Sequence, residues 1–258
     1  MIIEQDHLTV RLAETERDRL SAERLRYRVF VEELGGDGPL VDHEERLERD
    51  RFDRFCEHLV LVDKRRGAGQ LDHVVGVYRL MTGAGAAAGE GFYSAGEYDL
   101  ERLHATGRQL LELGRSCVHP DYRDGLALMR LWTGLGAFVQ RTGAEILFGV
   151  ASFHGTDVDP LAMPLSHLHH AHLAPEHLRV RAHADAFQRM DLMDPAAIDR
   201  VRAMRAVPPL IKSYLKLGGF VGEGAFVDRA FNTTDVCLVL DTARLSARDR
   251  ARFSGSPA

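Results

Sequence analysis

The spacing of hydrophobic residues changes between Leu111 and Trp132, and this change marks the centre of the predicted fold. Side chains from Leu111 to Val118 fall alternately on two faces, which predicts a β-strand. After His119-Pro120, apolar residues recur at helical spacing as far as Gly143. A helix that begins directly after a strand presents unpaired N–H groups and a partial positive charge at its start. The turn between them therefore has a geometry suited to phosphate binding.

Strands and helices flank this central pair in a mixed order. Thr15 and Asp18 predict a helix start, and two apolar runs, His58–Asp63 and His73–Thr82, separated by a short turn predict an antiparallel hairpin. The small-residue stretch 83–91 predicts a loop or connector. The remaining predicted strands and helices are a strand at Ile146–Ser152, a helix at Pro208–Leu217, and strands at Phe220–Asp228 and Asp235–Leu240. This order predicts an α/β fold with a mixed central sheet flanked by helices.

Residues 153–207 differ from the rest of the chain and are predicted to form a helical insertion before the last helix. Pro160, Pro164 and Pro175 divide the stretch into short helical or irregular pieces. The polar and glycine-rich segments elsewhere are short, and no repeat is evident. We therefore predict a single domain, 1–258, with this insertion and with terminal antiparallel strands.

Composition narrows the class of partners. The chain has 258 residues, is 45% hydrophobic and carries a formal net charge of -5. A surface of this charge argues against nucleic-acid binding, so an acidic partner needs a local basic patch. Three widely spaced cysteines favour buried, reduced thiols. No secretory signal and no window of about 20 apolar residues is visible, which predicts a cytoplasmic protein.

Five histidines between His167 and His177 raise the question of a metal site. Their His-x-His-His-x-His spacing lacks the two helical histidines and general-base glutamate of the HExxH type, and no cysteine lies near. The sequence therefore predicts no metal.

Two motifs resemble those of the GNAT acyltransferase superfamily. The stretch HPDYRDGLALMRLW after residue 118 resembles its pyrophosphate loop, although the Arg-to-Gly spacing is one residue tighter. The resemblance implies that the loop holds the 4′-phosphopantetheine arm of an acyl carrier, and the residues implied are Val118, Arg123, Asp124, Gly125 and Ala127. The stretch YLKLGGF from Tyr214 is similar to the Tyr-x-x-x-Gly-Phe signature, in which the tyrosine protonates the departing thiolate. A neutral tyrosine hydroxyl suits a general acid, and a simple packing role is the alternative.

Four further pieces resemble the acyl-homoserine-lactone synthases, a GNAT branch. They are Arg26 with Phe30; Glu48, Asp50, Phe52 and Asp53; Gly76, Arg79 and Leu80; and Glu112, Leu113 and Arg115. The tryptophan that this branch carries after its first helix is replaced here by the stretch 34–36, and the likeness fades beyond the central helix. A lactone synthase is therefore not implied.

The whole chain is more similar to the ornithine N-acyltransferases. The stretches that carry the resemblance are ELGRSCVHPDYR (112–123), ASFHGTD (151–157), LHHAHLAP (168–175), PPLIKSYLKLGG (208–219) and FNTTDV (231–236). The resemblance implies transfer of a 3-hydroxyacyl group from acyl carrier protein to the α-amine of ornithine, giving lyso-ornithine lipid. It implies no cofactor bound by the enzyme itself. Since this product is an amphiphile, we expect peripheral contact with the inner membrane.

The charged residues of these motifs suit such a substrate, because ornithine carries one carboxylate and two amines. Arginines and acids in one site can recognise both signs. The candidate substrate-binding residues are Arg26, Asp50, Asp53, Arg79 and Arg115. The same residues equally fit a partly buried salt-bridge network that fixes the first helix against the sheet. Glu112 is the candidate base that accepts the proton of the amine, directly or through water, with pairing to Arg115 as the alternative.

Three other functions remain open at this point. The same chemistry could act on another amino acid such as glutamine or glycine; a carrier-protein-binding module could lack catalysis; and a short-chain acetyltransferase could use coenzyme A. Acyl carrier protein is acidic, so its docking surface is expected to be basic. The candidate residues for that surface are Arg123, Arg130, Arg141, Lys212 and Lys216.

Overall fold

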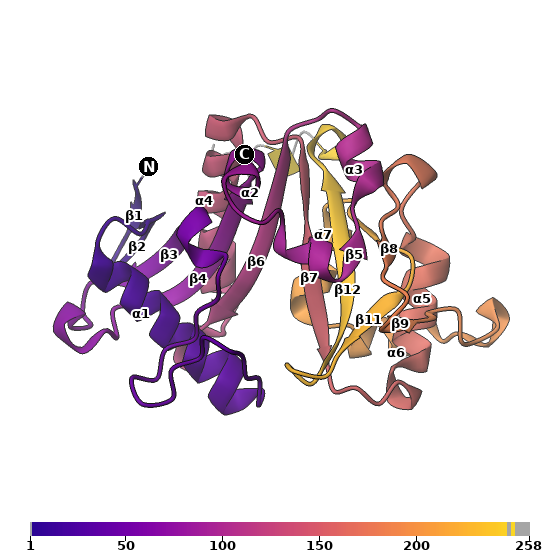
Figure 1. Cartoon of the computed structure of the whole chain (residues 1–258), viewed down its shortest axis with the longest axis horizontal. Helices are drawn as coiled ribbons and strands as arrows, with labels where there is room; N and C mark the ends of the chain where they lie inside the picture. The colour runs from indigo at the N-terminus through magenta and orange to yellow at the C-terminus, as the bar shows by residue number, and fades with distance from the viewer. Residues whose placement is uncertain (1, 247–248, 251–258) are drawn as a thin grey trace. The chain divides into compact units, whose positions relative to one another are not determined.

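A computed structural model describes residues 2–246 and 249–250, which fall into two compact units. The first unit contains residues 2–90, 113–143 and 249–250, and the second contains 91–112 and 144–246. Strand β6 (Leu110–Val118) contributes its first residues to the second unit and the others to the first. Figure 1 shows the elements in chain order.

The first unit is a sheet with a helix packed on each face. Its strands are β1 (Ile2–Gln5), β2 (Leu8–Leu12), β3 (Glu57–Asp63) and β4 (Val74–Thr82), paired antiparallel in that order, with β6 beside β4. Its helices are α1 (Glu16–Arg26), the π-helix η1 (Tyr27–Glu33), α2 (Gly83–Ala88) and α4 (Leu126–Thr142). Short 3-10 turns lie at Asp53–Phe55, Ala68–Gln70 and Pro120–Tyr122.

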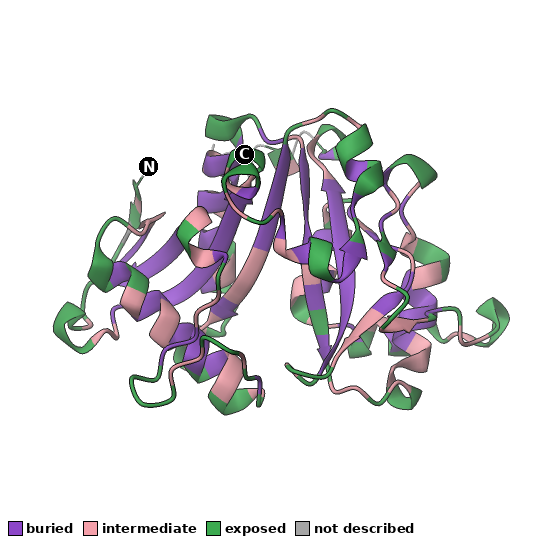
Figure 2. Ribbon diagram, in the orientation of Figure 1, coloured by how far each residue is buried: buried purple, intermediate pink, exposed green. Residues whose placement is uncertain are grey.

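Two helices explain why the middle of β3, Leu59–Val62, is apolar at every position. Val60 and Val62 belong to the core under α1, whereas Leu59 lies close to Gly134 of α4. The strand is thus covered on both faces and its middle is fully buried (Figure 2). A Cβ atom at Gly134 would lie 2.3 Å from Val10 Cγ1, so this glycine permits the close approach of α4 to the sheet.

The predicted loop at 83–91 was wrong in its first part, because Gly83–Ala88 forms helix α2. Thr82 caps this helix by accepting a hydrogen bond from the Gly85 N–H. A Cβ at Gly85 would lie 2.4 Å from the Phe55 carbonyl oxygen. The small residues therefore allow α2 to pack closely against the 3-10 turn at Asp53–Phe55.

The second unit contains a mixed sheet. Strand β7 (Ile146–His154) pairs parallel with residues 110–112 of β6 and antiparallel with β12 (Thr233–Asp241), which also pairs with β10 (Phe220–Val221) and β11 (Ala225–Asp228). β9 (Phe187–Gln188) borders β11, and β5 (Tyr98–Asp99) pairs with β8 (Arg181–Ala182). The predicted strand at Phe220–Asp228 is therefore two strands.

Helices α3 (Glu101–Ala105), α5 (Ala162–His172), α6 (Arg200–Ala206) and α7 (Pro209–Lys216) complete the second unit. Its 3-10 turns lie at Tyr93–Gly96, Asp159–Leu161, Glu176–Leu178, Pro195–Ala197 and Thr242–Arg244. The predicted fold class, a mixed α/β sheet flanked by helices, is confirmed. The single-domain assignment with an insertion stays a prediction. Within the described residues, none of the helices has the length and apolar character needed to cross a bilayer.

Candidate functional site

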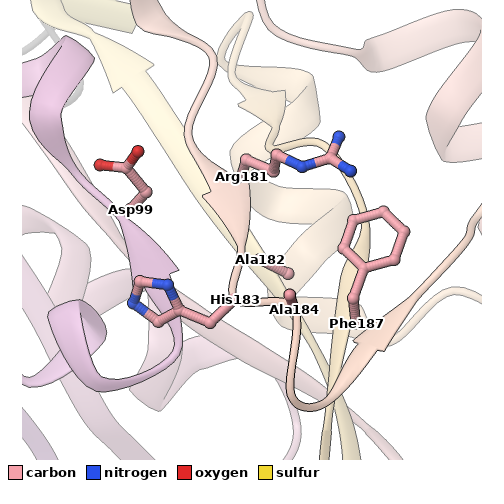
Figure 3. A pocket seen from close by; sticks show the side chains of 6 residues that line it. All are labelled: Asp99, Arg181, Ala182, His183, Ala184 and Phe187. Atoms are coloured by element: carbon pink, nitrogen blue, oxygen red, sulfur yellow. The ribbon is translucent and has the colours of Figure 1, made fainter.

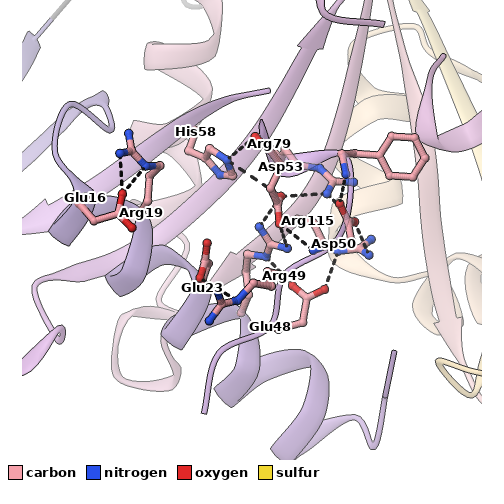
Figure 4. Close-up of polar contacts among 12 residues, drawn as sticks. Glu16, Arg19, Glu23, Glu48, Arg49, Asp50, Asp53, His58, Arg79 and Arg115 are labelled. Carbon is pink, nitrogen blue, oxygen red and sulfur yellow. Dashed lines mark hydrogen bonds and ion pairs between the residues drawn. The ribbon is translucent and has the colours of Figure 1, made fainter. Parts of the chain in front are cut away.

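The first unit brings all five predicted substrate-binding residues into one network of ion pairs. Figure 4 labels four of them, Asp50, Asp53, Arg79 and Arg115. Arg26, the last residue of α1, donates through Nη1 and Nη2 to the two carboxylate oxygens of Asp53, at 2.8 and 3.0 Å. Arg79 of β4 donates to Asp50 at 2.5 Å and to Asp53 at 3.0 Å. Arg115 of β6 donates to Asp50 at 2.9 Å. The predicted motifs, far apart in sequence, therefore meet in space.

Glu48 completes this network, although it was not among the predicted site residues. Its Oε2 lies 2.5 Å from Arg26 Nε, and its Oε1 lies 3.1 Å from Arg115 Nε. Arg26 is 0% exposed and Glu48 1% exposed. Glu48 lies in the same acidic motif as Asp50 and Asp53, so its position two residues before Asp50 was the signal that could have identified it.

The charges of the network balance, with three guanidinium groups opposite three carboxylates. Burial is the largest single influence on the pKa of Asp53 and Glu48 and raises both, but the charge of Arg26, its hydrogen bonds and the charge of a second arginine together outweigh burial, and both pKa values lie below their ordinary range. Burial together with the charge of Arg26 lowers the pKa of His58 to about 4, so this neighbouring imidazole is neutral at pH 7. Asp50, with 18% of its side chain exposed, is the most accessible member of the network.

This geometry is that of a partly buried salt-bridge network that fixes the first helix against the sheet. The arginines donate to the acids, and α1 is thereby tied to β4 and β6. Asp50 and Arg115 lie on the more accessible side of the network. An amino acid that binds there would replace the ion pair between these two side chains with contacts to its own charged groups. A substrate-binding role for the five residues stays a prediction.

Arg115 has an unusual backbone conformation. Its φ is 49°, in the left-handed region that a residue with a Cβ avoids. Regular pairing of β6 with β7 covers Leu110–Glu112, and Arg115 follows three residues later. Strain of this kind costs about 1–3 kcal/mol and clusters at functional sites. The bonds from Arg115 to Glu48 and Asp50 hold the residue in this conformation.

Glu112, the predicted base, is held by backbone donors of the second unit. Its side chain is 4% exposed, and its oxygens accept hydrogen bonds from the N–H groups of Tyr93 at 2.8 Å and Ser94 at 2.6 Å. Each carboxylate oxygen has two lone pairs, so these bonds leave capacity for a further proton donor. The carboxylate thus fixes the turn at Tyr93–Gly96, and its role as a base stays a prediction.

Tyr214, the predicted acid, is buried in α7 with 3% of the residue exposed. The glycines that follow it in the motif end this helix. Gly218 has a φ of 82°, and a Cβ at Gly219 would lie 2.9 Å from the Tyr214 carbonyl oxygen. The spacing of the motif is therefore explained by the sharp helix end, which fixes Tyr214 relative to β10. Its role as an acid stays a prediction.

The predicted phosphopantetheine residues form one turn between β6 and α4. Gly125 is the N-cap of α4 with a φ of 91°, and Asp124 accepts a hydrogen bond from the Leu126 N–H at 2.9 Å. The Arg123 guanidinium donates to the Val118 carbonyl oxygen at 3.0 Å and to Glu33 at 2.8 Å. The turn precedes a helix of 17 residues, as phosphate binding at a helix start requires. Contact of Val118 and Ala127 with the carrier arm stays a prediction, as it does for the other three.

The candidate docking residues differ in accessibility. Arg123, Arg141 and Lys216 are exposed, and Lys212 is partly exposed and donates to the Arg205 carbonyl oxygen. Arg130 is buried, with Nη2 3.6 Å from an Asp6 carboxylate oxygen. Arg130 is thus the member of this set least available to a partner.

The histidine-rich stretch packs against itself and against neighbouring acids. The rings of His167 and His172 meet edge to face at 5.6 Å, and His170 Nε2 lies 3.0 Å from Asp191. Within residues 2–246 and 249–250, the one group with ligand atoms close enough to share a cation consists of Glu97, Asp228 and Asp235. Among the same residues no disulfide joins the three cysteines, and burial raises the pKa of Cys117 to about 12.

A pocket of about 440 Å³ lies beside β5, β8 and β9 in the second unit. Figure 3 shows that its charged side chains do not converge: Asp99 and Arg181 extend in opposite directions. The Arg181 guanidinium lies over the Phe187 ring at 4.5 Å and pairs with Glu223. The His183 Nε2–H group donates to the Ala95 carbonyl oxygen at 2.9 Å. This pocket therefore does not present an arginine and an acid to one amino acid.

Several known proteins are similar to this chain. A family model described as an acetyltransferase (GNAT) domain matches residues 25–133. The L-ornithine N(α)-acyltransferase of Rhodobacter capsulatus is 58% identical over 245 residues, which cover 95% of this chain and 94% of the relative. The protein of the same name from Brucella abortus is 43% identical, covering 93% and 86%. The solved structure of the acyl-homoserine-lactone synthase LasI is 14% identical, with a TM-score of 0.52 and 98% of both chains covered, and it supports the fold alone.

Proposed function

This chain belongs to the L-ornithine N(α)-acyltransferase family, and from that premise we propose that it transfers a 3-hydroxyacyl group from acyl carrier protein to the α-amine of ornithine. The product is lyso-ornithine lipid. The observation that carries the proposal is the 58% identity over nearly the whole chain to a relative of that name. The chain is an acyltransferase of the GNAT type.

The reaction needs a neutral amine, an activated carbonyl and a protonated leaving group. Glu112 takes a proton from the α-ammonium group, and the amine nitrogen then attacks the thioester carbon. The negative oxygen that forms is bound by backbone N–H groups of β6. When the carbon–sulfur bond breaks, the Tyr214 hydroxyl protonates the thiolate of the 4′-phosphopantetheine arm, and the second proton that the attacking nitrogen loses returns to the tyrosine oxygen, directly or through water. An amide bond replaces the thioester, and free carrier protein leaves.

Ornithine recognition is assigned to the accessible side of the charged network. The ornithine carboxylate is bound by Arg115, the most accessible arginine of the network, and its distal ammonium group is bound by Asp50, the most accessible acid. Arg26, Arg79 and Asp53 hold these two groups in place through the bonds already described. Holding both reactants in position accounts for much of the rate, since well-oriented reactions gain about 7–11 kcal/mol.

The donor is delivered by a protein, so the partner of this enzyme is acyl carrier protein. Arg123–Ala127 receives the single phosphate of its arm, and exposed basic residues such as Arg141 and Lys216 contact its acidic surface. The product carries a long acyl chain and a charged head, and peripheral contact with the inner membrane follows from that chemistry.

One competition experiment tests donor and acceptor together. Purified enzyme is incubated with 3-hydroxyacyl-carrier protein and an equimolar mixture of ornithine, lysine, glutamine and glycine, and the products are identified by mass spectrometry. We expect N-acyl ornithine as the main product, and little product when the carrier protein is replaced by the coenzyme A thioester. A different acylated amino acid, equal use of coenzyme A, or no product at all would each contradict the corresponding part of the proposal.

A further inference from the structure

A second pocket, of about 450 Å³, lies in the first unit between α1, the π-helix, the turn before β4 and the end of β6. Its lining includes Arg24, Arg28 and Arg46, together with the buried His119. The residues of the predicted carrier loop, Arg123–Ala127, do not line it. This pocket is therefore distinct from the place assigned to the phosphopantetheine arm.

Two of its arginines have no acid beside them. Arg46 pairs with Glu32, but in the part of the chain that the structure describes neither Arg24 nor Arg28 has a carboxylate within ion-pair distance. Arg24 donates to the Glu45 carbonyl oxygen at 2.9 Å, and its Nε is buried without a hydrogen-bond partner. The two acids of the lining, Glu32 and Asp72, pair with Arg46 and Arg66, so the guanidinium groups of Arg24 and Arg28 add positive charge to the pocket that these acids do not cancel.

Arg28 points to an imidazole instead of an acid. Its Nη1 lies 2.5 Å from His119 Nε2, and Arg66 Nη1 lies 3.4 Å from the same nitrogen. His119 Nδ1 faces the Asp121 N–H at 3.2 Å. A neutral imidazole has only one acceptor nitrogen, so it cannot accept from donors at both positions. An anionic oxygen in the pocket would give these donors an acceptor.

The backbone supports a binding role for this place. Tyr27, Arg28 and Glu32 reach the pocket from a π-helix of seven residues, and π-helical turns occur frequently at functional sites. Leu25, Leu71 and Val74 supply an apolar part of the lining. A forked guanidinium group matches phosphate oxygens in two-point contacts. We propose that this pocket binds a phosphate group, carried by a small soluble molecule or by a lipid headgroup, with Arg24 and Arg28 as its main ligands.

Phosphate titration tests this proposal without any assay of acyl transfer. Binding of inorganic phosphate is followed by ³¹P NMR at constant ionic strength for the unaltered protein and for Arg24→Gln and Arg28→Gln. Each substitution removes charged hydrogen bonds, and we expect affinity to fall about tenfold or more. Arg17→Gln is the matched control, because Arg17 is an exposed arginine of α1 that does not line the pocket. It should bind phosphate as the unaltered protein does.

Vesicle flotation separates the two sources of phosphate. If the ligand is a lipid, phosphatidylglycerol vesicles carry the protein and phosphatidylcholine vesicles do not, and Arg28→Gln abolishes the difference while Arg17→Gln keeps it. If the ligand is soluble, inorganic phosphate binds and neither vesicle does so in an Arg28-dependent way. Lack of both effects, or an equal loss with Arg17→Gln, would overturn the proposal.

Two measurements distinguish a loss of phosphate binding from a loss of folding. Arg28→Lys keeps the charge but loses the fork, so we expect intermediate affinity in a folded protein. In the unaltered protein, the imidazole signals of His119 should shift on addition of phosphate. If phosphate saturates the protein without moving these signals, it binds elsewhere and the proposal is wrong.

Discussion

Two buried glutamates, one in each unit, show two ways of holding a carboxylate away from water. Glu48 accepts hydrogen bonds from the guanidinium groups of Arg26 and Arg115. Glu112 accepts from the backbone N–H groups of Tyr93 and Ser94. The two arginines cancel the charge of Glu48, which suits this glutamate to a structural role. The backbone donors orient the Glu112 carboxylate, and the proposed role of Glu112 as the base is what a change of that carboxylate tests.

The largest effect is expected when the charge balance around Glu48 is broken. Arg26→Gln leaves Glu48 and Asp53 buried beside a neutral amide, and breaking a buried pair in this way costs about 3–5 kcal/mol. Urea unfolding measures this loss. Arg19→Gln, which removes an exposed pair with Glu16 on the same helix, should cost less than about 0.5 kcal/mol. A loss below about 1 kcal/mol for Arg26→Gln would mean that the network contributes little to stability.

The same conservative change at Glu112 should act mainly on turnover. Glu112→Gln removes the proton acceptor, and loss of a general base lowers kcat by roughly 10²–10⁴. It also places an NH₂ group against a backbone N–H, at a cost of about 1–3 kcal/mol, so thermal melting must accompany the kinetics.

Ser94→Ala is the control for Glu112→Gln. It alters the same turn but keeps both backbone donors, and it should retain most of the turnover. A Glu112→Gln enzyme that is folded and fully active would leave Glu112 with the role of Glu48, that of a structural carboxylate.

Tyr214→Phe tests the partner of Glu112 in the reaction. It removes one hydroxyl from a buried ring, and loss of a general acid should lower turnover roughly a hundredfold. A donor with an aromatic thiol as leaving group needs no proton, so it should restore the rate of Tyr214→Phe but not that of Glu112→Gln. Equal rescue of both variants, or of neither, would contradict the separate roles.

Much of this fold was accessible from local sequence patterns. The predicted strand at His58–Asp63 corresponds to β3, because helices on both faces require apolar side chains on both. The predicted helix start at Thr15 is confirmed by a capping box with Asp18. The helix predicted at Pro208–Leu217 is α7, Pro209–Lys216. Each of these features depends on residues close together in the chain.

The features that were missed depend on distant contacts. The left-handed conformation of Arg115 has no local signal, since it is fixed by bonds to Glu48 and Asp50 from another segment. The π-helix after Arg26 follows an unbroken helical pattern in the sequence. Helix α2 forms in a glycine-rich stretch of low helical propensity because it packs against Phe55. The candidate site residues were predicted from the resemblance to known families, and the structure shows which of them contact one another.

Glu23 provides a third kind of buried carboxylate and a smaller, pH-dependent effect. It lies on α1, 3.5 Å from Arg49 Nε, and its Oε2 is buried without a hydrogen bond. Burial outweighs the charge of Arg49 and raises the pKa of Glu23 to about 7. The folded protein therefore holds a proton that the unfolded chain, with its ordinary pKa, releases between about pH 4.5 and 7.

The sign of this linkage gives the expected result for Glu23→Gln. In the unaltered protein, the stability that comes from the bound proton is complete below about pH 4.5 and is lost as the pH rises to about 7. Glutamine does not titrate, so the substitution should raise the free energy of unfolding by about 1–3 kcal/mol at pH 8 and by less at pH 5. Urea unfolding of both proteins at these two pH values measures the difference. If the gain in unfolding free energy is the same at both pH values, Glu23 is ionised at both. The charge of Arg49 then stabilises the Glu23 carboxylate as Arg26 stabilises that of Glu48.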